Sequence, residues 1–144
     1  GGVHGGMGDA FRNRLDYQWM VGGQFLGHPY VGPYTVRVRQ PKNVIMEGLP
    51  KQFDYSSEQY YMQVDPGIDV LADTVYSYEG QAVNMPVVWV KSWGKGKVFY
   101  SALGHSAEEL KKHPQVVEMS IKGLLWAAAS KSACGSCAGC CGCG

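Results

Sequence analysis

Three histidines and one glutamate of this 144-residue chain stand where side chains could do chemistry. His4 lies in the segment GGVHGGMG, whose small residues leave an imidazole and several amides open to a ligand. His105 follows the apolar segment 98–103, and ligands of open α/β sheets bind beyond the carboxyl ends of strands. Glu58 comes just before an aromatic segment. Imidazole and carboxyl groups with tuned pKa values exchange protons near neutral pH, so Glu58 or His105 could act as a general base or acid, and His4 could hold a substrate or a water molecule.

Each of these residues also has a plainer interpretation. A lone histidine such as His4 is as compatible with a purely structural role, and Glu58 with a solvated charge at a strand edge. His28, within Gly-His-Pro, indicates a turn and by itself only a loop histidine. His113 precedes Pro114 at a corner between two helices, where we expect it to be exposed and inert.

Composition limits the classes of partner. A net charge of +1 without a run of Lys or Arg provides no footprint for a nucleic acid or an anionic membrane. The longest apolar stretches, 86–90 and 124–129, are far shorter than the ~20 residues of a membrane-spanning helix. No Gly-Lys-Ser/Thr follows the first glycines, so no nucleotide motif is predicted. The sequence starts at Gly1 without a basic and then apolar leader, so the localisation is not predicted; a homo-oligomer stays open, because the sequence does not fix the oligomeric state.

The cysteines divide the chain into a domain, 1–129, and a tail, 130–144. All five cysteines lie in the tail, which excludes a disulfide framework and a cysteine nucleophile within the domain. The spacing C-x-x-C-x-x-C-C-x-C could bind a soft metal such as zinc or Cu(I). The Gly-rich composition favours the alternative, a disordered extension.

The expected elements are those of a strand-rich α/β or α+β domain. A helix over 11–21 should begin at Asp9 and stop at Gly22. Five segments rich in Val, Tyr or Trp predict strands, the last two joined by a turn at 94–97: 34–40, 60–64, 69–76, 87–93 and 98–103. Ser106 and Glu109 predict a capping box.

A second helix should follow from Pro114 to about residue 129. Its apolar residues recur at helical spacing and predict one buried face: Val117, Ile121, Leu124, Leu125 and Ala128. The glycine cluster at the start has no predicted strand before it, so we expect the chain to begin partway through a domain.

Four segments in order resemble the ThuA-like family, named for trehalose utilisation. They are GVHG at 2–5, VGGQFLGHP at 21–29, GLP at 48–50 with Glu58 and Tyr60 downstream, and the stretch 86–105, from PVVWV through GKGKVFY to LGH. The chain departs from the family at Asn43, where a histidine is common, and at Ser57, where an acidic residue is common. Glu58 itself is retained.

The resemblance implies a flavodoxin-like three-layer sandwich, as in class I glutamine amidotransferases, with N-terminal strands missing from this chain. His4 then lies at the turn where amidotransferases carry a cysteine, and His105 is similar in place to their histidine. Because the domain has no cysteine, release of ammonia from glutamine is disfavoured.

The resemblance further implies carbohydrate catabolism, with a disaccharide or an oxidised keto sugar as the small-molecule partner. We expect catalysis by His4, Glu58 and His105 in a hydrolase or an isomerase-type enzyme. The expected substrate-binding residues, some of them aromatic rings able to stack on a sugar, are His28, Asp9, Trp19 and Tyr60. Three alternatives stay open: a divalent metal held by the histidines in a metal-dependent hydrolase, a non-catalytic sugar-binding or interaction module, and a fragment that does not fold alone.

Overall fold

The computed structural model describes residues 1–129, and the predicted metal-binding or disordered tail lies outside the described residues. Ten elements follow one another along these residues: β1 (Gly2–Val3), α1 (His4–Gly8), α2 (Leu15–Val21), β2 (Gly23–Val38), β3 (Gln52–Val64), β4 (Asp69–Tyr78), β5 (Gln81–Trp93), β6 (Gly96–Ser101), α3 (Ala107–Lys112) and α4 (Pro114–Ala128). None of the helices in this part of the chain is long and apolar enough to cross a membrane.

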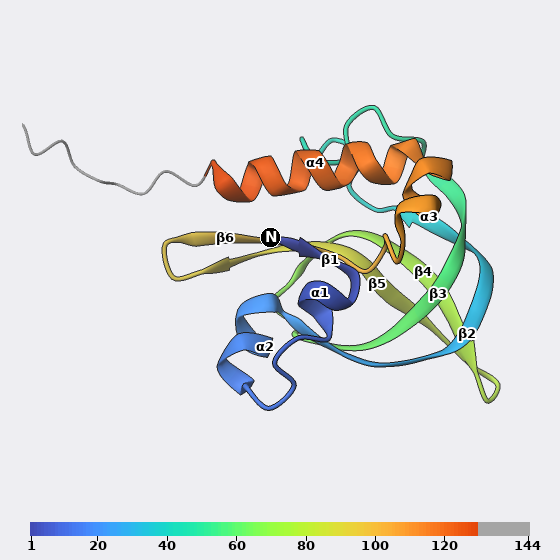
Figure 1. Ribbon diagram of the computed structural model, residues 1–144, viewed down its shortest axis with the longest axis horizontal. Helices are drawn as coiled ribbons and strands as arrows, with labels where there is room; N and C mark the ends of the chain where they lie inside the picture. The colour runs from blue at the N-terminus through green and yellow to red at the C-terminus, as the bar shows by residue number, and fades with distance from the viewer. Residues whose placement is uncertain (130–144) are drawn as a thin grey trace, which may run out of the picture.

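The strands form one curled sheet in the order β1-β6-β5-β4-β2-β3, with helices on both sides (Figure 1). α4 lies along one face, and α1 and α2 lie on the other (Figure 1). The strand β1 pairs with β6 in parallel, whereas the other pairings are antiparallel. The fold is therefore mixed α/β, and among residues 1–129 the parallel arrangement of a flavodoxin-like sheet is confined to β1 and β6.

The strand predictions are confirmed in position, but three strands are much longer than their sequence patterns indicated, β5 among them, since it begins at Gln81. β2 begins at Gly23 and β3 at Gln52. As a result His28, predicted in a turn, lies within β2, and Glu58 lies inside β3 instead of ahead of it. The 94–97 turn is confirmed, since Trp93 pairs with Gly96 across the β5–β6 hairpin.

The first helix prediction, over 11–21, is wrong in its first half. Phe11 has a φ of 50° and Arg14 is extended, so the chain turns after α1 and the helix α2 starts only at Leu15. Asp9 caps the carboxyl end of α1 instead of beginning a helix. The predicted stop is confirmed, because Gly22 takes the left-handed conformation that ends α2.

The apolar face predicted for α4 is also wrong. Ile121, Leu124 and Leu125 are 52%, 42% and 64% exposed. The buried residues of α4 are Val116, Met119, Gly123 and Ala127. The helix approaches the sheet most closely at Gly123, where an added Cβ would lie 2.3 Å from the ring of Phe99, so this face and not the leucine face packs on the sheet.

The core joins both helical layers to the sheet. Trp89 and Phe99, on neighbouring strands, are fully buried. The indole N–H of Trp89 donates to the carbonyl of Val21 at 2.9 Å, which fixes the end of α2 against one face. Phe99 packs under Gly123 of α4 on the other face.

We predict that Gly123→Ala destabilises the protein by about 1–3 kcal/mol, because the added methyl overpacks the contact with Phe99. Urea unfolding followed by circular dichroism measures the change. Gly6→Ala in α1 is the matched control, since nothing lies within 4 Å of its added Cβ. Equal stability of the Gly123→Ala variant and the wild type would show that α4 does not pack as described.

Candidate functional site

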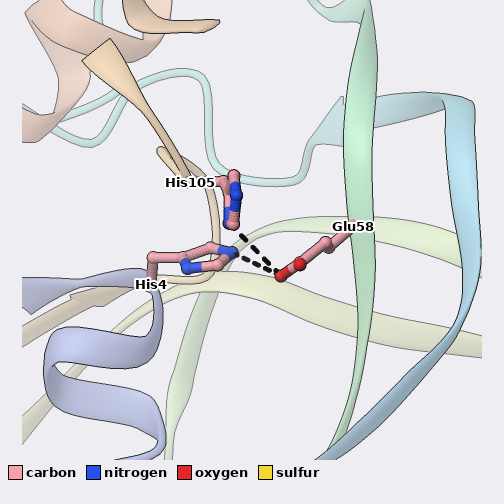
Figure 2. A group of neighbouring side chains, drawn as sticks. All are labelled: His4, Glu58 and His105. Carbon is pink, nitrogen blue, oxygen red and sulfur yellow. Dashed lines mark ion pairs between the residues drawn. The ribbon is translucent and has the colours of Figure 1, made fainter.

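Glu58 is the centre of a cluster of three imidazoles. Its Oε2 lies 3.4 Å from Nε2 of His4 and 3.4 Å from Nδ1 of His105. Its Oε1 lies 3.5 Å from Nε2 of His28. Figure 2 shows His4, Glu58 and His105 pointing toward one another from three separate segments. The four residues are far apart in the sequence, so the fold brings them together.

His4 and His105 follow the ends of neighbouring parallel strands. Val3 of β1 pairs with Ser101 of β6, so His4 and His105 leave the sheet at the same edge. This confirms the position predicted for His105 from the strand-end rule. It also corrects the expectation that no strand precedes the glycine cluster, because the two residues of β1 come directly before His4.

His4 occupies a sharp turn from strand to helix. Its φ is 48°, a conformation that L residues rarely adopt and that the surrounding contacts must hold. The hydroxyl of Tyr100 donates to the His4 carbonyl at 3.2 Å. The hydroxyl of Tyr60 lies 2.8 Å from Nδ1 of the imidazole, with the two rings 4.2 Å apart. Backbone and side chain of His4 are thus both held by tyrosines.

His28 reaches Glu58 because β2 is irregular opposite β3. Gly27 pairs with Tyr61 and Tyr30 with Gln59, so two residues, His28 and Pro29, lie opposite the single residue Tyr60. Such a bulge redirects a side chain that a regular strand would point elsewhere. Both His28 and Glu58 are therefore placed by the long β2–β3 pairing, which the sequence patterns indicated only in part.

The imidazole of His4 is neutral at physiological pH. Burial is the main cause that lowers its pKa to about 4; the charge of Glu58 opposes this shift, and the neighbouring His105 adds to it. Its Nε2 is buried and has no hydrogen-bond partner among the described residues, although it faces Glu58. A buried, neutral ring nitrogen without a partner is suited to form a hydrogen bond or to bind a metal ion.

Two imidazoles and one carboxylate also have the arrangement of a metal-ligand set. The candidate ligand atoms of His4, Glu58 and His105 all lie within 4.8 Å of one another. Two histidines and a glutamate are a known catalytic zinc set that leaves a coordination position open. Tyr60, on the other ring nitrogen of His4, occupies the place of a supporting hydrogen-bond partner.

The remaining predicted residues divide into near and distant ones. Tyr60 belongs to the cluster and also packs against Phe25, with ring centroids 4.3 Å apart. Asp9 forms an ion pair with Arg12 at 2.5 Å and, among residues 1–129, forms no hydrogen bond or ion pair with Glu58 or its three histidines. Trp19 is 65% exposed and packs against Trp93 on the surface of α2, apart from the cluster.

Sequence reasoning missed several residues around the cluster. Tyr34 donates to the carbonyl of Glu58 at 3.4 Å, and Tyr55 contacts the segment that carries His105. His113, expected to be exposed, is half-buried against the ring of Tyr55 at 4.5 Å. The signal that could have found Tyr55 is the tyrosine-rich run 55–61, if the whole run had been recognised as one strand.

Fold and site together define a mixed α/β protein with a histidine–glutamate cluster at one edge of its sheet. The family model described as "Trehalose utilisation" matches residues 1–127. The chain therefore belongs to the ThuA family, as its sequence segments predicted. No curated protein matches the chain.

Two solved structures have a similar fold. A thua-like protein from Parabacteroides merdae ATCC 43184 matches with a TM-score of 0.67 and 20% identity over 90% of this chain and 60% of its own. A thua-like protein from Bacteroides uniformis ATCC 8492 matches with a TM-score of 0.67 and 17% identity over 91% of this chain and 58% of its own. The chain thus spans about three fifths of either structure.

We predict that the buried His4 makes stability fall in mild acid. The unfolded chain takes up a proton near pH 6.5 and the folded chain only near pH 4, so stability is complete above pH 6.5 and is lost as the pH falls through this window. The loss should be about 1–2 kcal/mol at pH 5. Asn also tolerates a positive φ, so His4→Asn should lose less stability than the wild type between pH 7 and pH 5. Urea unfolding at both pH values in the presence of a chelator tests this, and parallel losses in both proteins would contradict it.

Proposed function

We propose that this chain binds a sugar at the His4–Glu58–His105 cluster and processes it by proton transfer. The observation that carries the proposal is one partly buried carboxylate within 3.5 Å of three imidazoles from three separate segments. Such a group offers proton donors and acceptors side by side, as general acid–base catalysis requires. Membership of a family described as "Trehalose utilisation" supports a sugar as the reactant.

The environments of the residues suggest different roles. Glu58 is 21% exposed, so its carboxylate is accessible to a substrate and can act as a general base. His105 is 50% exposed and lies across the cluster, in a position to act as a general acid. His4, buried and neutral, would hold the substrate or a water molecule through its ring nitrogen.

The substrate we propose is a disaccharide or a keto sugar derived from one. Phe25 and Tyr60 pack together beside His28, whose ring lies 6.4 Å from Tyr60 in a nearly parallel orientation. Aromatic faces next to hydrogen-bonding groups are suited to the apolar C–H face and the hydroxyls of a sugar ring. His28, 39% exposed at the edge of the cluster, would contact the substrate directly.

A second candidate is a metal-dependent hydrolase, which the close grouping of His4, Glu58 and His105 favours. The buried Nε2 of His4, without a hydrogen-bond partner among residues 1–129, is an atom that a divalent ion would satisfy. A metal ion at such a site supplies an activated water molecule near neutral pH. The thiol mechanism of amidotransferases is not part of either proposal, because the cysteines all lie beyond residue 129.

We further propose that the fold is part of a flavodoxin-like sandwich, whose sheet continues with strands before Gly1. It is supported by the position of β1 at the end of the sheet and by the exposed Leu124, which lies beside Gly1 on the covering helix. A longer form of the protein in which β1 remains an edge strand would contradict it.

We predict that Glu58→Gln and His105→Asn each lower kcat/KM by a factor of 10² or more on whichever sugar the wild type converts, since each removes a proton-transfer group. A screen of disaccharides and their keto forms, with product detection by chromatography, measures turnover. Glu47→Gln, a change of the same kind on an exposed loop residue, should leave turnover unchanged. Circular dichroism shows whether each variant is folded.

The outcomes separate the candidates. Turnover that survives a chelator supports direct acid–base chemistry, whereas loss with chelator and recovery with Zn²⁺ supports the metal-dependent hydrolase. Sugar binding without turnover in the wild type would indicate a non-catalytic binding module. Full turnover in folded Glu58→Gln would contradict the proposal.

A further inference from the structure

One buried tyrosine ties the segment that carries His105 to the strand that carries Glu58. Tyr55 lies on β3 and is 1% exposed. Its hydroxyl accepts the backbone N–H of Gly104 at 2.9 Å and donates to the carboxylate of Glu109. Gly104 directly precedes His105, so the hydroxyl is one residue from the imidazole that it holds in place.

Glu109 closes the same loop from its other end. Its backbone N–H donates to the hydroxyl of Ser106, which confirms half of the predicted capping box. Its side chain does not complete the box but accepts the Tyr55 hydroxyl instead. The loop 104–106 is therefore attached to Tyr55 directly through Gly104 and indirectly through the first turn of α3.

Tyr55 itself is held from both sides. The ring of His113 packs against it at 4.5 Å, and Tyr34 lies edge-on at 5.8 Å. Tyr34 in turn donates to the carbonyl of Glu58 at 3.4 Å. Gly104 has a φ of 100°, a conformation that glycine adopts readily, and the hydrogen bond that its N–H donates to Tyr55 helps to fix the loop there.

We propose that Tyr55, with Glu109, is a positioning residue that sets the distance between His105 and Glu58. Tyr55 is buried and acts through the segment that carries His105. The inference rests on the proposed function in one respect: the placement of His105 matters because His105 belongs to the reacting cluster. Residues that orient a ligand from outside its direct contacts typically change affinity by a factor of 10–100.

The test measures Zn²⁺ affinity by calorimetry for the wild type, Tyr55→Phe, His105→Ala and the double variant, each with the five tail cysteines changed to serine because the tail could itself bind zinc. We expect Tyr55→Phe to weaken binding about tenfold in the wild-type background and to have no further effect when His105 is absent. Tyr76→Phe is the matched control, because Tyr76 is as deeply buried and its hydroxyl has no hydrogen-bond partner among the described residues. Its affinity should stay within twofold of the wild type.

A second pair of variants protects the test against misfolding of Tyr55→Phe. Glu109→Gln keeps an oxygen that accepts the Tyr55 hydroxyl and should bind Zn²⁺ more tightly than Glu109→Ala. Equal affinity of Tyr55→Phe and the wild type, or additive losses in the double variant, would overturn the proposal.

Failure of the metal candidate gives a different result, namely no Zn²⁺ binding by the wild type. Hydrogen exchange of the Gly104 amide then decides, because this amide should be protected in the wild type and should exchange at least tenfold faster in Tyr55→Phe. Unchanged exchange would overturn the positioning role whether or not the protein binds a metal.

Discussion

The site depends on the contact between the neutral, buried imidazole of His4 and the carboxylate of Glu58. A charged group buried without a partner is costly, and the fold avoids this cost at His4 by lowering the pKa of the imidazole. The carboxylate of Glu58 is near enough to oppose that shift but does not cancel it. The protein thereby keeps a neutral imidazole nitrogen and a carboxylate oxygen 3.4 Å apart.

Strand β3 carries Glu58 and the tyrosines that contact the segments of both His4 and His105. Within six residues it carries Tyr55, which holds the His105 loop, Glu58, and Tyr60, which holds the ring of His4. His4 and His105 follow the ends of the parallel strands β1 and β6, so both lie at the same edge of the sheet. The antiparallel strands between β6 and β3 then set the separation of the two sides of the cluster, so the curl of the sheet is part of the site.

Local patterns predicted the residues of the cluster better than its geometry. His105 could be placed because a strand-end position follows from a short apolar segment and a glycine, and the ThuA resemblance selected Glu58 and His4. The bulge that turns His28 toward Glu58 could not be predicted, because Gly-His-Pro has the composition of a turn and only pairing with β3 makes it a strand.

The errors in the helices have the same origin. Counting apolar residues along α4 selected the side with Leu124 and Leu125, whereas close contact with Phe99 requires the side with Gly123. The sequence does not single out Tyr55, because its contacts are with groups some fifty residues away, at Gly104 and Glu109. Contacts of this kind exist only once the sheet and α3 are assembled.

The most direct measurement of the central claim is the ring ¹⁵N chemical shifts of labelled histidines in the wild type and in Glu58→Gln. If one carboxylate organises three imidazoles, the shifts of His4, His28 and His105 change together when its charge is removed, while those of His113 stay the same. Unchanged shifts of the three histidines, or an equal change at His113, would show that Glu58 does not organise the cluster.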